Sequence, residues 1–329
     1  MASPRRLLVT GAAGFIGSHV SEALVAQGYE VVGVDNFDPF YPRAAKERNL
    51  ESLRRSAAFR LVEVDITRDA LPLAGVEAVL HLAAKPGVRP SLEDPAAYTE
   101  ANVTGTARVL DAARRSGVRR IVLGSSSSVY GTSTSAPFAE DAPAVTPISP
   151  YAASKRAAEL LAHAFAHLYK LRIICLRFFT VYGPRQRPDL AVYRFTERIT
   201  RGLPVRMHGD GSSERDYTYI SDAVDGVLKA LEWTSRGKRG GNGGDFEIVN
   251  IGGGGRVRLD RLIGLIGEAL GGGPEVRVER LPDQPGDVPL TAADLRRAGG
   301  QLGYRPRVGI EEGIPHFVRW YEATHGRQS

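Results

Sequence analysis

Cysteine is almost absent from this chain, which contains one, Cys175, among its 329 residues. A single cysteine excludes an intrachain disulfide framework. Its place in the apolar run 172–176 predicts a buried core thiol rather than a nucleophile. Chains without disulfides are typical of reducing compartments, so we expect a cytoplasmic protein.

Long apolar runs and concentrated charge are also absent. No stretch approaches the roughly 18–20 apolar residues that cross a bilayer, so no membrane partner is expected. The net charge of +6 comes from scattered basic residues. No basic and aromatic residues interleave as a stacking platform, so no nucleic-acid partner is expected. His163 and His167 share a helix face without a third ligand, so no metal site is expected.

The first half of the chain alternates short apolar runs with helical stretches. Strands are expected at 7–10, 29–35, 59–65, 78–83 and 121–125, and helices at 15–27, 44–56 and 99–116. A helix at 151–169 and a strand at 172–178 follow. This alternation predicts an α/β fold, a doubly wound parallel sheet of the Rossmann type. Beyond residue 180 the alternation loosens, and we expect a smaller C-terminal α/β substrate lobe there.

A glycine-rich turn joins the first expected strand to the first helix, with Gly11, Gly14 and Gly17 in the spacing GxxGxxG. Glycines permit a tight turn and let backbone amides approach a pyrophosphate at the positive end of a helix. Asp35 ends the second strand, near the offset of about 20 residues at which a carboxylate binds the adenosine ribose. A carboxylate there also repels a 2′-phosphate. The combination predicts a dinucleotide site that prefers NAD to NADP.

Tyr151 and Lys155 stand one helical turn apart in the sequence YAASK. A free tyrosine, with a pKa of about 10, is a poor base at pH 7. A nearby lysine cation and the positive nicotinamide would stabilise the phenolate. Residues 125–128 are four serines at the end of the preceding strand, and a hydroxyl there can share the substrate proton. The group therefore predicts hydride chemistry with Tyr151 as the base.

These motifs together resemble the extended branch of the short-chain dehydrogenase/reductase family, and within it the NAD-dependent sugar epimerases. The resemblance assigns catalytic roles to Ser126, Tyr151 and Lys155. It implies NAD contacts by Gly11, Gly14, Phe15, Ile16, Gly17, Asp35, Asn36, Asp65, Ile66, Leu82, Ala83, Ala84, Lys85, Tyr151, Lys155 and Phe178. It also implies a homodimer, because members commonly pair through two helices. The expected division is an NAD-binding domain of residues 1–180 with about 217–251, and a nucleotide-sugar-binding lobe of residues 181–216 and 252–329.

The two residues after Ser126 narrow the expected reaction. Dehydratases similar to this chain carry an Asp-Glu pair there, and UDP-glucuronate decarboxylases carry a Glu. Here Ser127 and Ser128 occupy these positions, and neither can act as a general acid or base. A 4-keto intermediate is then expected to rotate and to take the hydride back on its other face, which is 4-epimerisation.

Several segments are similar to UDP-glucuronate 4-epimerases, namely 35–38, 84–89, 125–128, 177–184, 187–189 and 284–289. The resemblance implies substrate contacts by Arg89, Ser127, Ser128, Thr180, Arg187, Arg215 and Asp287. Hydroxyl donors suit a uronate carboxylate, which only accepts hydrogen bonds. The resemblance puts Arg215 on the diphosphate and Asp287 on the nucleotide ribose. The expected substrate is UDP-glucuronate, and UDP-glucose or UDP-N-acetylglucosamine is the alternative. A non-catalytic NAD-binding regulator is disfavoured, because it would be expected to have lost Tyr151 or Lys155.

Overall fold

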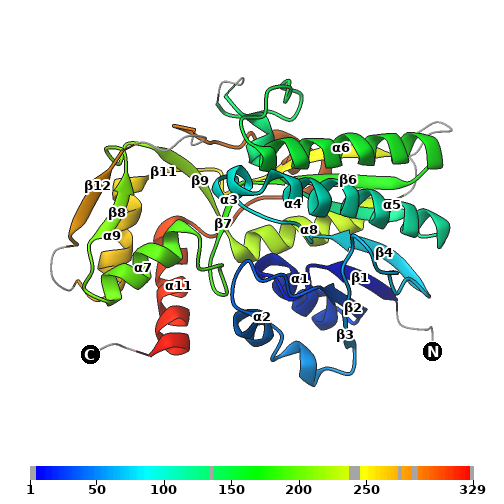
Figure 1. Cartoon of the computed structure of the whole chain (residues 1–329), viewed down its shortest axis with the longest axis horizontal. Coiled ribbons are helices and arrows are strands. Elements are labelled where there is room, and N and C mark those ends of the chain that lie inside the picture. Colours follow the sequence, from blue (N-terminus) through cyan, green and yellow to red (C-terminus); the bar gives the residue numbers. More distant parts are fainter. Residues whose placement is uncertain (1–4, 133–135, 237–244, 273–275, 283–287, 327–329) are drawn as a thin grey trace.

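A seven-stranded sheet lies at the centre of the computed structural model, which describes residues 5–132, 136–236, 245–272, 276–282 and 288–326 (Figure 1). Its strands are β1 (Arg6–Thr10), β2 (Glu30–Asp35), β3 (Phe59–Glu63), β4 (Val76–His81), β5 (Arg120–Ser126), β6 (Arg172–Phe178) and β10 (Phe246–Ile251). They follow the order β10-β6-β5-β4-β1-β2-β3, and all neighbours are parallel. The predicted doubly wound sheet is confirmed.

Helices cover both faces of this sheet (Figure 1). One face is covered by α1 (Phe15–Ala26), α8 (Ile220–Ser235) and α10 (Arg296–Leu302), and the other by α5 (Gly105–Arg115) and α6 (Pro150–Tyr169). Because both faces are covered, the central strands are buried along almost their whole length. Cys175 on β6 is fully buried, as predicted.

The remaining large elements surround a second apolar core. Helices α7 (Ala191–Thr200), α9 (Leu259–Ala269) and α11 (Ile310–His325) belong to it. Beside them lie a three-stranded sheet, β11 (Arg256–Arg258), β9 (Glu214–Tyr219) and β7 (Thr180–Tyr182), and a parallel pair, β12 (Val278–Leu281) and β8 (Val205–His208). Helix α10, although late in the chain, packs on α8 and β10 of the central sheet. The domain boundaries given above stay a prediction.

Two expected helices are interrupted. The stretch 44–56 forms α2 (Arg43–Asn49) and then a short 3-10 turn, η1 (Leu53–Arg55). The stretch 99–116 consists of one π-helical turn, η2 (Glu100–Thr104), followed by α5. Two short helices, α3 (Val88–Glu93) and α4 (Pro95–Thr99), precede η2. A 3-10 turn, η3 (Ser127–Tyr130), follows β5. None of the described helices has the length and apolar character to span a membrane.

Candidate active site

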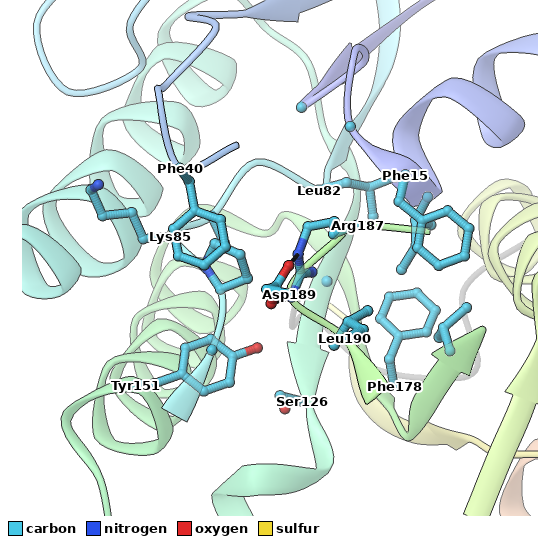
Figure 2. A pocket seen from close by; sticks show the side chains of 18 of the residues that line it. Phe15, Phe40, Leu82, Lys85, Ser126, Tyr151, Phe178, Arg187, Asp189 and Leu190 are labelled. Atoms are coloured by element: carbon cyan, nitrogen blue, oxygen red, sulfur yellow. Dashed lines mark hydrogen bonds and ion pairs between the residues drawn. The ribbon is translucent and has the colours of Figure 1, made fainter. Parts of the chain in front are cut away.

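A cavity of about 730 Å³ runs along the carboxyl ends of the central strands and reaches the second core (Figure 2). The strand order reverses between β1 and β4, and open α/β sheets bind ligands at such switch points. Every predicted site residue that the structure describes lines this one cavity. Asp287, predicted for the nucleotide ribose, lies outside the described residues.

The glycine turn leaves the start of α1 open to the cavity. Gly11 has φ +70°, and a methyl group on Gly17 would overlap the Gly11 carbonyl, so both positions require glycine. Helix α1 begins at Phe15 without a capping side chain and without an acidic residue in its first turn. Its first amide groups therefore have no acceptor within the helix, and the positive helix end fits a diphosphate.

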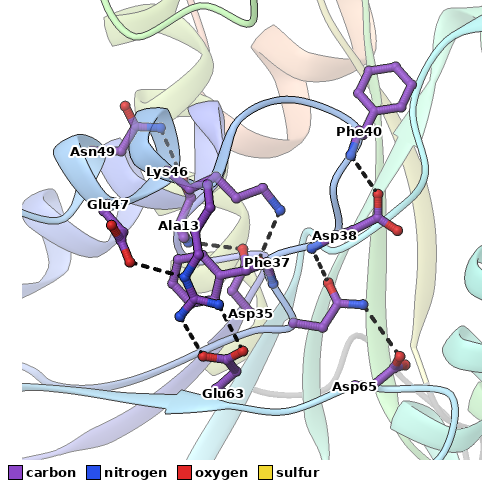
Figure 3. Close-up of polar contacts among 12 residues, drawn as sticks. Ala13, Asp35, Phe37, Asp38, Phe40, Lys46, Glu47, Asn49, Glu63 and Asp65 are labelled. Atoms are coloured by element: carbon purple, nitrogen blue, oxygen red, sulfur yellow. Dashed lines mark hydrogen bonds and ion pairs between the residues drawn. The ribbon is translucent and has the colours of Figure 1, made fainter.

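The loop after β2 is organised around the carboxylate of Asp35 (Figure 3). Asp35 Oδ2 accepts from the Ala13 amide at 3.1 Å, and Oδ1 accepts from the Phe37 amide at 2.8 Å. Lys46 Nζ on α2 donates to the same Oδ1 at 3.1 Å. Sequence reasoning missed Lys46, since nothing in a polar helix singles out one lysine.

A set of hydrogen bonds made by Asn102 fixes the loop after β4. Asn102, in the π-helical turn η2, accepts from the Lys85 amide at 2.8 Å and donates to the Lys85 carbonyl at 3.0 Å. Its amide group also donates to Ser154 Oγ on α6 at 2.9 Å. Asn102 therefore ties the wall of the cavity to the helix that carries Tyr151, and no sequence motif indicated this. The Lys85 side chain pairs with Asp38 at 3.0 Å.

The start of α6 places Tyr151 in the cavity. Ser149 caps the helix by accepting from the Ala152 amide at 3.1 Å, and Pro150 occupies the first turn. Figure 2 shows the Tyr151 hydroxyl directed toward the space above Ser126. Ser126 ends β5, where its Oγ donates to Ser128 Oγ at 3.1 Å. The predicted tyrosine and serine therefore face the same space from a helix and a strand.

The charged side chain that acts on the Tyr151 phenol differs from the one expected from the sequence. Burial raises the pKa of Tyr151, while a hydrogen bond with Ser126 and the charge of Arg187 oppose that rise. Lys155, which was expected to act on the phenol, instead donates from Nζ to the Gly124 carbonyl at 2.6 Å. The cation that acts on Tyr151 here is Arg187, a role that sequence reasoning did not assign to it.

A buried ion pair lies behind the catalytic strand and helix. Glu159, one turn after Lys155 on α6, accepts from Ser125 Oγ at 2.6 Å and from the Arg177 guanidinium through two bonds of 2.9 Å. Both charged side chains are at most 1% exposed, and Arg177 also lies 4.6 Å above the Tyr130 ring. The pair fixes β5, β6 and α6 relative to one another. Burial lowers the pKa of Lys155 to about 8, and the Glu159 charge opposes that fall.

The loop between β7 and α7 brings a further ion pair to the site. Arg187 Nε and one terminal nitrogen donate to the two Asp189 oxygens at 2.9 and 3.0 Å, close to Tyr151 (Figure 2). The loop is anchored by Arg185, which has φ +66° and donates to Glu22 on α1 at 2.9 Å. Sequence reasoning named Arg187 but missed Asp189 as its partner.

Hydroxyl and basic groups line the rest of the cavity. Ser127, Ser128 and Thr180 lie at the end near Tyr151, and Arg89 lines the cavity wall. The second core contributes Arg194, Arg206, His208, Arg215 and Tyr217 at the other end. Of these five, sequence reasoning named only Arg215.

Comparison with known proteins agrees with this geometry. The NAD dependent epimerase/dehydratase family matches residues 7–252. The probable UDP-glucuronate 4-epimerase of Rhizobium meliloti is 40% identical, over 98% of each chain. The UDP-glucuronate 4-epimerase of Thermodesulfobacterium geofontis is 39% identical, over 95% of each. A crystal structure of UDP-glucuronic acid 4-epimerase from Bacillus cereus, in complex with UDP-glucuronic acid and NAD, is 35% identical and has a TM-score of 0.89, covering 97% of this chain and all of that one. The chain therefore belongs to the NAD dependent epimerase/dehydratase family.

Proposed function

We propose that this protein is an isomerase that interconverts UDP-glucuronate and UDP-galacturonate by epimerisation at C4, with NAD as its cofactor. The observation that carries the proposal is the set of hydroxyls beside the phenol. Ser126 and Tyr151 face one space, and Ser127 and Ser128 stand where related dehydratases and decarboxylases place acids. The printed names of the similar epimerases support the same reaction.

In the proposed reaction the Tyr151 phenolate removes the proton of the C4 hydroxyl, while Ser126 hydrogen-bonds the same oxygen. NAD, when bound, would supply the acceptor for the C4 hydride and the donor that returns this hydride to the opposite face of the ketone. Tyr151 then gives the proton back to the C4 oxygen, so the cycle consumes neither protons nor cofactor. The glycine turn and Asp35 would hold the cofactor, and Lys155 would add a positive charge near the reacting groups.

Ser127, Ser128 and Thr180 would hold the substrate carboxylate. A 4-keto uronate is a β-keto acid, and it loses CO₂ readily when its carboxylate stands perpendicular to the ring carbonyl. Hydroxyl donors that fix the carboxylate in another orientation would suppress this loss. Arg187 could contribute charge-assisted hydrogen bonds. Arg89 remains a proposed substrate contact, Arg215 a proposed contact of the diphosphate, and Asp287 a proposed contact of the nucleotide ribose.

One observation favours the alternative, a 4-epimerase for UDP-glucose or UDP-N-acetylglucosamine. The Arg187 charge is already balanced by Asp189 through two hydrogen bonds. A neutral sugar would not need to disturb this pair, whereas a carboxylate that uses Arg187 must compete with Asp189.

Incubation of the purified protein with UDP-glucuronate, without added NADH, tests the proposal by NMR of the sugar. We expect UDP-galacturonate to appear. Accumulation of UDP-xylose would instead indicate decarboxylation. Conversion of UDP-glucose or UDP-N-acetylglucosamine, with UDP-glucuronate left unchanged, would establish the alternative.

The double substitution of Ser127 and Ser128 by alanine tests the carboxylate contacts. Losing two hydroxyl donors should weaken UDP-glucuronate binding by about a hundredfold, at about 1.5 kcal/mol for each hydrogen bond to a charged group, and should increase the pentose by-product. The KM and the pentose fraction, measured by NMR, check this. Thr132→Ala, outside the serine cluster, is the control. Unchanged KM and product ratio would rule out the assigned role.

We also propose a cytoplasmic homodimer. The one cysteine is buried, which suits a reducing compartment. On α6, Leu160, Leu168 and Tyr169 are 56%, 64% and 41% exposed, a set of apolar side chains that a second copy could cover. Light scattering of the purified protein should give twice the chain mass, and Leu160→Glu should reduce it to one chain. A single-chain mass for the unaltered protein would contradict the dimer.

A further inference from the structure

Asn250 is a buried polar residue that the proposed reaction does not use. It lies near the carboxyl end of β10, is fully buried, and is not among the residues that line the cavity. A buried amide costs free energy unless its donors and its acceptor are hydrogen-bonded. Its hydrogen-bond partners therefore determine what it contributes to the fold and to the site.

The Asn250 side chain joins three segments that are distant in the sequence. Its Oδ1 accepts from the Tyr130 hydroxyl at 2.7 Å, and its Nδ2 donates to the carbonyls of Phe138 at 2.7 Å and Asp294 at 3.2 Å. The amide group thereby uses both of its N–H donors. The Asn250 backbone N–H also donates to Glu140 Oε1 at 2.8 Å. One residue thus connects the turn η3, the loop before α6 and the segment that precedes α10.

On one side this connection reaches the sugar end of the cavity. Tyr130 is the last residue of η3, the turn that carries Ser127 and Ser128 into the cavity. The Tyr130 ring is fully buried, 4.6 Å from the Arg177 guanidinium and 5.0 Å from the Phe138 ring. Because the ring is packed on its faces and its hydroxyl is bonded to β10, the two serines have a defined position relative to Asn250's strand.

On the other side the connection reaches β9, the strand that carries Arg215. The segment 289–294 runs beside this strand. Before Arg215, the Glu214 amide and carbonyl are hydrogen-bonded to the segment at 2.9 and 3.1 Å. After it, the buried Asp216 carboxylate accepts from an amide of the segment at 3.0 Å. The residue predicted to bind the diphosphate is therefore flanked by bonds to the segment that Asn250 holds.

We propose that Asn250 is a positioning residue, which keeps η3 and Arg215 at the spacing that one nucleotide-sugar molecule requires. The sugar and the nucleotide of such a substrate are joined covalently, so the two ends of the cavity must bind groups whose separation is fixed. If the ends shift relative to one another, each can still bind its own group, but one molecule no longer fits both. A shift of about 1 Å can cost about 10²-fold in activity. The inference rests on the proposed function, in which η3 binds the sugar and Arg215 the diphosphate.

The dissociation constants of UDP and of UDP-glucuronate, measured by isothermal titration calorimetry, compare one end of the site with both ends together. Every protein carries Tyr151→Phe and bound NAD, so that the sugar binds without being converted. Tyr130→Phe keeps the ring and removes the hydroxyl that bonds Asn250. It should weaken UDP-glucuronate binding by about tenfold, the worth of one hydrogen bond to a charged group, and leave UDP binding within about twofold.

Asn250→Asp breaks the connection at its other end. An aspartate keeps an acceptor for the Tyr130 hydroxyl but has no N–H donor for the carbonyls of Phe138 and Asp294. Strand β9 is also held by β11 and β7, so UDP alone should still bind. UDP-glucuronate should bind more weakly, as in Tyr130→Phe. The double variant should lose less than the sum of the two single losses, because the bonds act in series.

Tyr304→Phe is the matched control. Tyr304 is a phenol that is 1% exposed, and its hydroxyl donates at 2.8 Å to the carbonyl of Gly252, two residues after Asn250. Its loss should leave both dissociation constants unchanged. Three results would overturn the proposal: an unchanged ratio of the two constants in Tyr130→Phe, an equal weakening of both ligands in that variant, or the same selective loss in Tyr304→Phe.

Failure of the proposed function would give a different result. If the parent protein with Tyr151→Phe binds UDP-glucuronate no more tightly than UDP, the assigned sugar is wrong. UDP-glucose and UDP-N-acetylglucosamine then replace it in the same comparison, because Ser127 and Ser128 of η3 border the sugar end of the cavity whichever sugar is bound.

Discussion

Replacement of Tyr151 by phenylalanine is expected to lower the turnover number for UDP-glucuronate by about 10²- to 10⁴-fold, the usual contribution of a positioned acid-base group. The phenol faces Ser126 in the cavity, and no other described side chain there has both the position and the hydroxyl to replace it. The change removes one oxygen from a side chain of the same shape. Bound NAD and the thermal midpoint should therefore stay as in the unaltered protein. Turnover followed by NMR and the nucleotide content of the protein check both statements.

Tyr98→Phe is the matched control for this substitution. The Tyr98 ring lies edge-on to Tyr151, with 6.2 Å between the ring centres, and its hydroxyl donates to the Pro86 carbonyl at 2.5 Å. Its loss removes a neighbouring phenol that has no assigned part in proton transfer, so turnover should fall by less than about tenfold. Tyr151→Phe with turnover within tenfold of the unaltered protein would refute the assignment of the base.

Replacement of Glu159 by glutamine is expected to lower the free energy of unfolding by about 3–5 kcal/mol, the usual cost of removing one partner of a buried ion pair. The Arg177 guanidinium would stay buried with its charge uncompensated. Denaturant unfolding measures this loss. Arg156→Met is the control, because Arg156 is 26% exposed at its side chain and its loss leaves the bond between Glu159 and Arg177 in place. Equal stability losses for the two variants would show that the buried pair of Glu159 and Arg177 contributes no more to the free energy of unfolding than the exposed one.

The same substitution is expected to change the pH dependence of activity. Burial lowers the pKa of Lys155 to about 8, and Glu159 raises it. Without the Glu159 charge the Lys155 pKa must fall further. If the charged lysine is the active form, activity is lost as the pH rises through this pKa, so the alkaline limb should move to lower pH in Glu159→Gln. An alkaline limb that does not move would contradict the link between Glu159 and Lys155.

The sequence predicted the parts of the site that follow from strand ends. Parallel strands bring their carboxyl ends to one edge, so Gly11, Asp35, Ser126 and Phe178 could be placed in one cavity from their positions after apolar runs. Tyr151 and Lys155 followed from their helical spacing. The fold class followed from the same alternation, because buried parallel strands are uniformly apolar.

The missed residues depend on pairing in space. Lys46 is one of several charged residues on a polar helix, and only the fold turns it toward Asp35. A helix was predicted over residues 44–56 from composition, but α2 ends at Asn49. The Asn49 side chain donates to the Ala13 carbonyl at 3.0 Å, a tertiary contact that composition does not reveal. The π-helical turn at 100–104 carries Asn102 between Lys85 and Ser154, and hydrophobic periodicity does not indicate such a junction.

The loop from Gly183 to Leu190 contacts both the helix that follows the glycine turn and the space in front of Tyr151. Through Arg185 it is fixed to Glu22 on α1, the helix that begins at the glycine turn, and through Arg187 and Asp189 it borders the space in front of Tyr151. We expect these two ends to be thermodynamically linked, so that the factor by which bound cofactor changes sugar affinity equals the factor by which bound sugar changes cofactor affinity. Through this linkage, the oxidation state of the cofactor would determine how tightly the ketone intermediate is bound. An epimerase needs tight binding of the ketone, because a ketone that dissociates leaves the enzyme with reduced cofactor and therefore inactive.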